Sequence, residues 1–305
     1  MTREASGPGA ADPLSLQGVV PPTVTAFHDD ESLDAEVTAA HARFVVDRGA
    51  AGVFPLGTNG EFPLVTADER ERVVECVVSE VGDEVPVIAG VGAPSTRETV
   101  ANARAAAGAG ADGIVVVTPF YYPLDDTAAV EHYRRVVEAV DLPTYVYHIP
   151  SKTGNALSLS ALSALAEAGV AGVKDSSKDV PWLGQAIDAN PELTFLAGSD
   201  SLLFPGLQVG CTGVVSAVAN VFPELVVDLY EAYDAGDRER ARDLQSTVYE
   251  VRDALKRGPY MAGVKTALAV REDAPDAGPL RSPLRGMAES DREALVADLD
   301  ALNVV

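Results

Sequence analysis

Residues 170–177 read Val-Ala-Gly-Val-Lys-Asp-Ser-Ser, and this stretch decides how the rest of the chain is interpreted. Its short apolar run predicts a buried strand, and Lys174 closes that strand. The whole chain has only five lysines. A lysine kept at the end of a buried strand in such a chain suggests that its amine has a function there. A lysine desolvated in a pocket loses basicity and can attack a carbonyl carbon to form a Schiff base. The alternative is a surface lysine whose stem covers apolar surface.

Similar apolar runs recur along the chain, and a helix-like stretch follows each of them. Eight parallel β-then-α units predict an α/β fold of the (β/α)8 TIM barrel type. A doubly wound open sheet is the alternative, but its Gly-x-Gly-x-x-Gly loop is missing after the first strand. The predicted strands are Gly18–Val24, Gly52–Pro55, Val85–Ala89, Gly113–Val117, Thr144–Tyr147, Val170–Lys174, Leu193–Ala197 and Gly213–Ser216.

The stretches between the strands are amphipathic, as barrel helices require. Thr66 with Glu69 three residues later has the pattern of a capping box. Beyond residue 236 the strand pattern stops and only helices are predicted. We therefore expect a flexible N-terminal tail over 1–16, a catalytic barrel over 17–236 and a C-terminal helical extension over 237–305. The predicted helices include Leu33–Arg48, Ala67–Val81, Ser95–Ala107, Thr127–Val140, Arg238–Lys256, Tyr260–Val270 and Ser290–Ala301.

The chain is strongly acidic, with 23 Lys and Arg against 46 Asp and Glu and a net charge of −23. This charge argues against nucleic acid and against anionic membranes as partners. An acidic surface with few lysines is typical of a halophilic protein, because high salt screens the mutual repulsion. No apolar run approaches a membrane span, and the N-terminus lacks the apolar centre of a signal peptide. We expect a cytoplasmic protein with no metal and no other cofactor, since its four histidines have no ligand spacing.

In a barrel, active residues lie at the carboxyl ends of the strands and in the following loops. The loop after the second strand, residues 57–61, reads Gly-Thr-Asn-Gly-Glu and can direct N–H groups and a hydroxyl at a carboxylate. Tyr147 ends the fifth strand, and Lys152 lies in the loop beyond it. A lysine, a phenol and a carboxylate-binding loop on adjacent strands suit a class I aldolase. In such an enzyme the amine captures a keto acid and the phenol moves the proton.

Taken together, these motifs resemble the dihydrodipicolinate synthase / N-acetylneuraminate lyase superfamily of pyruvate-dependent, imine-forming barrels. The resemblance runs over essentially the whole chain from Gly18. Its ordered motifs are Gly-Thr-Asn-Gly-Glu at 57–61, Pro-Phe-Tyr-Tyr-Pro at 119–123, Tyr-His-Ile-Pro-Ser-Lys-Thr-Gly at 147–154 and Gly-Val-Lys-Asp at 172–175. The stretches 198–200, 210–216 and 284–285 also resemble the superfamily.

The resemblance implies a role for each site residue. Lys174 would form the Schiff base with pyruvate, and Tyr147 would transfer the proton. Thr58, helped by Asn59, would bind the pyruvate carboxylate. Thr58 would also link Tyr147 to Tyr121.

In relatives, the residue matching Tyr121 often completes the site of a neighbouring subunit. This implies at least a tight dimer, and most relatives are homotetramers. The main-chain carbonyl of Val215 would lie near the imine carbon. His148 and Lys265 receive structural interpretations, since strand alternation points His148 away from the site and Lys265 lies within a helix.

The substrate is suggested by departures from the synthases. Synthases usually have arginine at the position of Lys152, threonine at that of Asn59 and glutamate at that of Asp175. A lysine does not replace the arginine fully, because the planar guanidinium binds a carboxylate through two hydrogen bonds whereas the ammonium is a point charge. Lys-Asp followed by Ser176 is more similar to 2-keto-3-deoxy sugar acid aldolases, in which the matching residue contacts sugar hydroxyls. The Gly-Thr-Asn-Gly-Glu-Phe stretch also resembles 4-hydroxy-2-oxoglutarate aldolases.

We therefore expect a 2-keto-3-deoxygluconate-type aldolase that releases pyruvate and a glyceraldehyde. Few basic residues are expected around the site, which disfavours a phosphorylated substrate. The main alternative is dihydrodipicolinate synthase, which condenses pyruvate with aspartate semialdehyde. Dehydration of keto-deoxy sugar acids through the same imine is a third possibility. A hypothesis of another class is a non-catalytic, ligand-sensing barrel, which would be expected to lose Lys174 or Tyr147.

Overall fold

The computed structural model describes residue 14 and residues 16–302. The tail expected over residues 1–16 therefore lies outside the described residues except at Leu14 and Leu16. Leu16 is 2% exposed and belongs to an apolar cluster that includes Ile88 and Val115 from the strands. The Tyr145 hydroxyl donates a hydrogen bond to the Leu14 carbonyl. Part of the expected tail thus packs against the strands.

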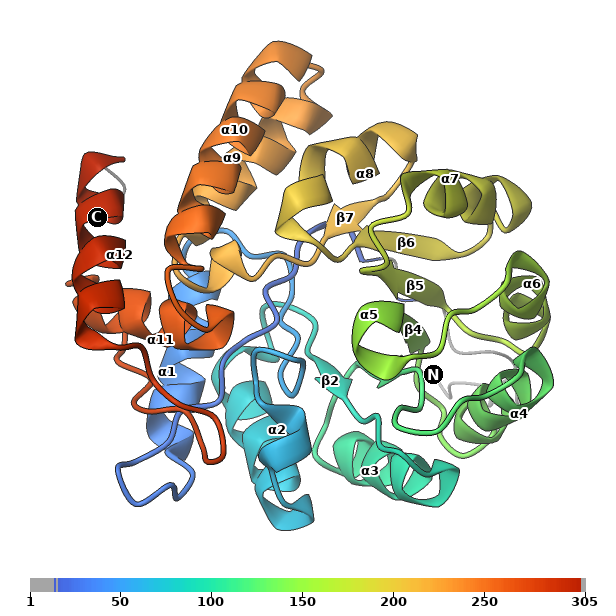
Figure 1. Ribbon diagram of the computed structural model, residues 1–305. Helices are drawn as coiled ribbons and strands as arrows, with labels where there is room; N and C mark the ends of the chain where they lie inside the picture. The colour runs from blue at the N-terminus through green and yellow to red at the C-terminus, as the bar shows by residue number, and fades with distance from the viewer. Residues whose placement is uncertain (1–13, 15, 303–305) are drawn as a thin grey trace, which may run out of the picture.

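A single parallel sheet curves around the centre of the molecule, and helices surround it (Figure 1). Its strand order, β1-β7-β6-β5-β4-β3-β2, follows the chain around the ring. The register of β4 against β5 places Tyr147 beside Lys174. The strands are β1 Gly18–Val19, β2 Ile88–Gly90, β3 Gly113–Val117, β4 Thr144–His148, β5 Gly172–Asp175, β6 Thr194–Ala197 and β7 Gly213–Val214.

Residues 51–55 fill the place between β1 and β2. On one side, the Ala51 N–H donates to the Val19 carbonyl at 2.8 Å. On the other side, the Gly90 N–H donates to the Pro55 carbonyl at 2.9 Å. These backbone bonds join the two ends of the sheet, so the predicted parallel α/β barrel is confirmed.

Two predicted strands are much shorter than expected. The strand predicted over Gly18–Val24 shrinks to the two residues of β1, because Pro21 and Pro22 have no N–H to continue the ladder. The strand predicted over Gly52–Pro55 reduces to one parallel bridge between Val53 and Val87.

The helices between the strands begin at local capping signals. Thr66 accepts from the Glu69 N–H and the Glu69 carboxylate accepts from the Thr66 N–H, so the predicted capping box is confirmed. The helices are α1 Ala35–Val46, α2 Ala67–Val81, α3 Thr96–Gly108, α4 Asp126–Val137, α5 Pro150–Thr153, α6 Leu159–Glu167, α7 Val180–Ala189, α8 Leu203–Val209 and α9 Pro223–Asp234, with short 3-10 turns at η1 Phe62–Leu64, η2 Asp200–Leu202 and η3 Val218–Asn220.

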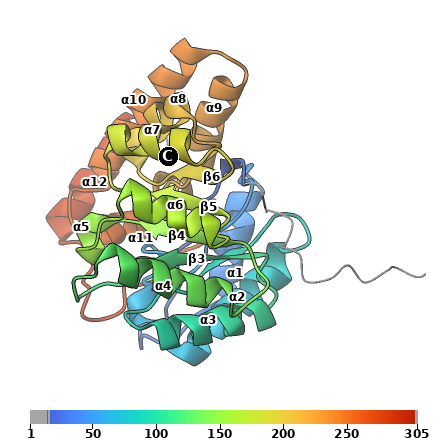
Figure 2. The same cartoon turned by 90° about the vertical axis from the view of Figure 1, so that its right-hand side faces the viewer.

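Three further helices, α10 Arg238–Ala254, α11 Tyr260–Val270 and α12 Glu289–Ala301, follow the barrel and gather on one side of it (Figure 1). Seen from the side, α11, α12 and the short α5 lie toward the same end of the barrel (Figure 2). Because α5 directly follows β4, this is the end where the strands terminate. Within the described range, no helix has both the length and the apolar character needed to cross a bilayer.

Candidate active site

A cavity of about 200 Å³ lies at the carboxyl ends of the strands. Lys174 from β5 and Tyr147 from β4 both line it, because the parallel register places them side by side. Thr58 and Asn59 line it from the loop after segment 51–55. The fold therefore gathers residues that are more than one hundred positions apart in the sequence.

The Lys174 amine is buried, and the side chain is only 4% exposed. Its Nζ lies 3.4 Å from the centroid of the Tyr147 ring and donates to the Ser176 Oγ at 3.1 Å. Ser176 in turn donates to the Gly198 carbonyl at 2.7 Å. Burial lowers the pKa of Lys174 below the ordinary lysine value, although Tyr147 and nearby carboxylates partly oppose this effect. A lowered pKa favours the neutral amine, which is the nucleophilic form.

The Tyr147 phenol connects the lysine to the loop that holds Thr58. Its oxygen lies 3.3 Å from the Thr58 Oγ1. Burial by itself would raise the pKa of Tyr147, but the charge of Lys174 and hydrogen bonds from Thr58 and Lys174 outweigh it and lower the pKa. A phenol whose pKa is lowered in this way can take up and return a proton more readily than a free tyrosine.

The loop at 57–61 offers unused hydrogen-bond capacity to a ligand. The Asn59 side chain is 8% exposed, and its buried Nδ2 has no hydrogen-bond partner among the described residues. A buried amide donor without a partner is costly, so it suits an oxygen atom of a bound molecule. Glu61 ends the loop in a left-handed conformation with φ of 53°. Its carboxylate lies 2.9 Å from the Lys265 amine and accepts from the Arg281 N–H at 2.9 Å.

Other predicted site residues also line the cavity. Val215 is buried beside it, and its N–H donates to the Ala197 carbonyl at 2.8 Å. Ser176 lines it next to Lys174. Lys152 extends from α5 as an exposed side chain at the rim. The structure therefore brings together Lys174, Tyr147 and Thr58 with every predicted binding residue.

Tyr121 is the exception within this chain. Its side chain is 84% exposed and its backbone is left-handed, with φ of 83°. It lies against Tyr122, with the ring centroids 5.0 Å apart, and does not line the cavity. The expected link from Thr58 to Tyr121 is therefore not made inside one chain, because the loop carries both tyrosines outward.

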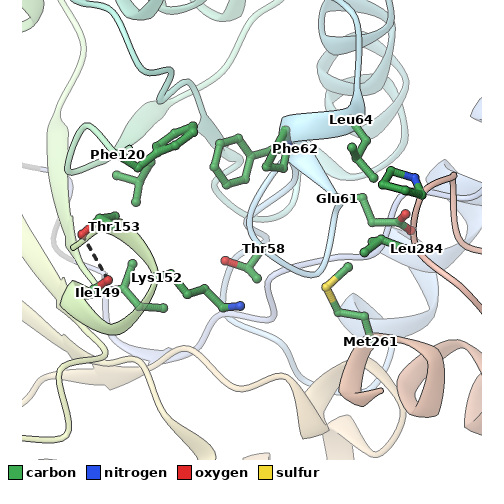
Figure 3. A pocket seen from close by; sticks show the side chains of 13 residues that line it. Thr58, Glu61, Phe62, Leu64, Phe120, Ile149, Lys152, Thr153, Met261 and Leu284 are labelled. Atoms are coloured by element: carbon green, nitrogen blue, oxygen red, sulfur yellow. Dashed lines mark hydrogen bonds between the residues drawn. The ribbon is translucent and has the colours of Figure 1, made fainter. Parts of the chain in front are cut away.

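Figure 3 shows a second, mostly apolar pocket, which has a volume of about 300 Å³ and shares lining residues with the first. Phe62 and Phe120 meet edge to face at its wall, with ring centroids 6.0 Å apart. Thr58, Ile149 and Lys152 line both pockets, and Lys152 reaches across the space below Thr58. The site is therefore continuous with an apolar surface on the side of Phe120.

Among the residues that line the cavity, sequence reasoning missed four ionisable ones: Asp200, Tyr260, Lys178 and Arg252. Asp200 lies in the recognised stretch 198–200, but it received no role. Arg252 and Tyr260 come from α10 and α11, and no local pattern in the sequence links those helices to the strand ends. The expectation that few basic residues flank the site is wrong, because two of these four are cations.

His148 has the structural role that strand alternation predicts. Its Nδ1 lies 2.9 Å from the Asp175 Oδ1, and both side chains are 3% exposed. Its Nε2 accepts from the Leu157 N–H at 3.2 Å, and the ring lies 4.3 Å from that of Trp182. An accepting Nε2 leaves Nδ1 as the protonated donor toward Asp175. His148 thus orients Asp175 between the barrel and its helices and does not line the cavity.

A parallel barrel whose strand ends place a buried amine against a phenol defines a class of proteins, the imine-forming lyases. Comparison with known proteins agrees with this class. The model of the dihydrodipicolinate synthetase family matches residues 15–302, and the chain belongs to this family. It is therefore an enzyme, a lyase related to the class I pyruvate aldolases.

Individual relatives extend the comparison. The chain is 75% identical to an uncharacterized DapA-like lyase of Halobacterium salinarum, with 100% of both chains covered. It is 38% identical to the 4-hydroxy-tetrahydrodipicolinate synthase of Natronomonas pharaonis, covering 94% of this chain and 98% of the relative. Among solved structures, a prophage protein of the dihydrodipicolinic acid synthase family from E. coli K12, in complex with pyruvate, superposes with a TM-score of 0.90 at 30% identity, covering 95% and 99% of the two chains.

Proposed function

We propose that this enzyme cleaves a 2-keto-3-deoxy sugar acid of the 2-keto-3-deoxygluconate type to pyruvate and a glyceraldehyde, through an imine on Lys174. The observation that carries the proposal is the buried Lys174 amine, 3.4 Å from the Tyr147 ring centroid and beside a cavity with a free amide donor at Asn59. Thr58 and Asn59 hold the substrate carboxylate in this proposal.

The chemistry follows from these positions. The Lys174 amine attacks the 2-keto carbon, and water leaves as the protonated imine forms. Tyr147 takes the proton of the C4 hydroxyl, the C3–C4 bond breaks, and the aldehyde departs. The electron pair of that bond moves toward the imine nitrogen and gives an enamine. The enamine takes a proton at C3, and water then releases pyruvate and restores the free amine.

Polar groups along the cavity support a hydroxylated substrate. Ser176 lies beside Lys174, and Ser151, Ser199 and Tyr260 line the same space. Hydroxyl groups and a buried amide can each donate or accept hydrogen bonds with sugar hydroxyls. The proposed partner is thus a small, oxygen-rich molecule. The proposal includes no metal or cofactor and places the enzyme in the cytoplasm.

Dihydrodipicolinate synthesis is the second candidate function. Relatives 37–38% identical to the chain have the name 4-hydroxy-tetrahydrodipicolinate synthase. Lys152 lies at the rim of the cavity and supplies a cation for the carboxylate of aspartate semialdehyde. Lysine offers a point charge there, whereas arginine would offer a fork.

Two assays separate these functions from each other and from a non-catalytic sensor. First, sodium borohydride and pyruvate should add mass to Lys174 in the wild type and not in Lys174→Ala; absence of the adduct would support the sensor. Second, the enzyme should release pyruvate from 2-keto-3-deoxygluconate and form no product from pyruvate plus aspartate semialdehyde. The reverse result would assign the synthase, and formation of a dehydrated keto acid without pyruvate release would assign a dehydratase.

We infer in addition that the enzyme works as a homotetramer built from two tight dimers. The inference rests on Tyr121 and Tyr122, which are 84% and 71% exposed and adjoin the apolar pocket through Phe120. Neighbouring exposed aromatic side chains are typical of an interface between subunits. In the tight dimer, Tyr121 of one subunit would approach Thr58 of the other.

A further inference from the structure

Lysine is concentrated around one cavity in this chain. Of its five lysines, three line the cavity: Lys152, Lys174 and Lys178. Arg252 joins them from the last turn of α10. In a chain with twice as many acidic as basic side chains, this concentration makes the cavity a locally basic site on an acidic molecule. Such a focus of charge attracts anions.

Lys178 and Arg252 have no carboxylate partner, since neither forms an ion pair within residues 16–302. Lys256, one turn beyond Arg252, is within electrostatic reach of both. Partial burial and then the charges of Arg252 and Lys178 lower the pKa of Lys256. Lys256 itself pairs with Asp253 at 3.6 Å and does not line the cavity. Lys178 and Arg252 thus line the cavity as two cations without an ion pair in the described range, and they repel each other unless an anion lies between them.

The position of Lys178 is set by the turn that follows β5. Its backbone is left-handed, with φ of 68°, which is uncommon for a residue other than glycine. The turn is held because Asp175 accepts from the Ser177 N–H at 3.1 Å and the Ser177 Oγ accepts from the Asp179 N–H at 3.0 Å. Asp175 is itself oriented by His148. A strained residue held at the edge of a site is typical of a functional position.

Asp200 is the one carboxylate that the described residues place in the cavity wall, and the cations there outnumber it. Asp200 is 5% exposed, and its two oxygens accept hydrogen bonds from the Ser216 Oγ at 2.6 Å and the Tyr260 hydroxyl at 2.7 Å. These neutral hydroxyl groups hold the carboxylate in place and leave its negative charge unchanged. The lining still favours an anion, because Lys152, Lys178 and Arg252 outnumber Asp200.

We propose that Lys178 and Arg252 form a subsite for an anionic group at the far end of the substrate, opposite the carboxylate held by Thr58 and Asn59. A carboxylate and a phosphate share the required chemistry, because the arginine fork binds either in a bidentate manner. The inference deepens the proposed function and rests on it, since the imine at Lys174 places the substrate. It favours a keto-deoxy sugar acid with a charged terminus over 2-keto-3-deoxygluconate itself.

The test compares two six-carbon 2-oxo acids that differ only at the far end. 2-Oxoadipate ends in a carboxylate and 2-oxohexanoate ends in a methyl group. Each forms the Lys174 imine with loss of water, and borohydride then delivers a hydride to the imine carbon and fixes the adduct. The quantity measured by mass spectrometry is the concentration of oxo acid that gives half-maximal adduct.

We expect wild-type enzyme to reach half-maximal adduct at about 10- to 100-fold lower concentration of 2-oxoadipate than of 2-oxohexanoate. Arg252→Gln and Lys178→Gln should each reduce this preference, and the double variant should abolish it. Arg242→Gln is the matched control, because it removes an exposed arginine of the same helix that does not line the cavity. Arg252→Lys should retain part of the preference.

The outcomes separate this inference from the proposed function. Equal half-maximal concentrations in the wild type, or a preference that survives in the double variant, would overturn the subsite while pyruvate trapping remains intact. Failure of pyruvate itself to be trapped would refute the imine and the subsite with it. Cleavage assays then identify the anion: 2-keto-3-deoxygluconate is compared with its 6-phosphate and with its counterpart that ends in a carboxylate. A higher kcat/KM for one of the two charged substrates would show whether the subsite binds a phosphate or a carboxylate. A higher kcat/KM for the neutral 2-keto-3-deoxygluconate would count against the subsite.

Discussion

Tyr147 is the residue that we propose to transfer the proton. It lies on the strand next to that of Lys174, with its hydroxyl 3.3 Å from the Thr58 Oγ1. Removing only the hydroxyl, in Tyr147→Phe, should leave the ring that packs under the amine. We expect kcat for cleavage to fall about 10²- to 10⁴-fold, which is the usual loss when a general acid or base is removed. Steady-state kinetics measures this loss.

Pyruvate trapping is the control for Tyr147→Phe, because the phenylalanine variant keeps Lys174 and its cavity. Adduct formation should persist at a level near that of the wild type. A variant that loses trapping and cleavage together would show that Tyr147 organises the site and that proton transfer is not its separate role.

Lys174 should also show its lowered pKa directly. Burial disfavours the ammonium form, so the amine becomes free at a pH below the ordinary lysine value of 10.5. Competitive acetylation with acetic anhydride measures this, since only neutral amines react. The labelling rate of Lys174, divided by that of a reference amine that stays deprotonated over the whole pH range, should rise with pH and level off below 10.5. A midpoint at or above 10.5 would contradict the desolvated state.

At the scale of elements, a buried ion pair joins the loop at residues 57–61 to the C-terminal helices. Glu61 and Lys265 are 1% and 4% exposed, with 2.9 Å between the carboxylate and the amine. Lys265 also donates to the Pro279 carbonyl at 2.7 Å. The pair therefore ties residues 57–61 to α11 and to the segment that follows it.

Breaking this pair should weaken both stability and binding. Lys265→Met leaves the Glu61 carboxylate buried without its cation, which typically costs about 3–5 kcal/mol in the free energy of unfolding. The looser loop should raise KM for the substrate more than it lowers kcat. Chemical denaturation and steady-state kinetics measure the two effects. The double variant Glu61→Gln/Lys265→Met should recover part of the loss, and full additivity of the two changes would argue against a coupled pair.

How far an element could be predicted from sequence depends on where its stabilising contacts lie. Helix α2 was predicted with its observed bounds, since the Thr66 cap and the apolar face are local signals. The strand predicted over Gly52–Pro55 reduces to a single bridge, because pairing depends on distant partners such as Val19 and Gly90. Arg252 was missed for the same reason, as its approach to the cavity depends on how α10 packs against the barrel.

At the scale of the whole molecule, the proposed homotetramer can be tested at its proposed interface. If the exposed pair Tyr121 and Tyr122 forms the tight dimer, replacing both with serine should shift the enzyme from tetramer toward smaller species. Sedimentation velocity at fixed salt measures this shift. The variant should keep its circular dichroism spectrum, because neither side chain is buried in the barrel. A tetramer that survives the double change would place the interface elsewhere.

The net charge of −23 and the pI near 4.4 also belong to the whole molecule. Many acidic side chains lie on the outer faces of the helices, where at low ionic strength they repel one another across the surface. Salt near 1 M shortens the screening length to about 3 Å, so this repulsion largely disappears. We therefore expect the thermal midpoint of unfolding to rise steeply between roughly 0.1 and 1 M KCl (~10 to 3 Å screening). Differential scanning calorimetry measures the midpoint, and equal osmolality of sucrose controls for excluded-cosolvent effects. A midpoint of thermal unfolding that is flat or falls with KCl would show that the acidic surface does not limit the stability of this fold.

Salt should have the opposite effect on binding at the subsite proposed for Lys178 and Arg252. The preference for 2-oxoadipate over 2-oxohexanoate should become smaller as the salt concentration rises, because the charges of these two side chains are screened as well.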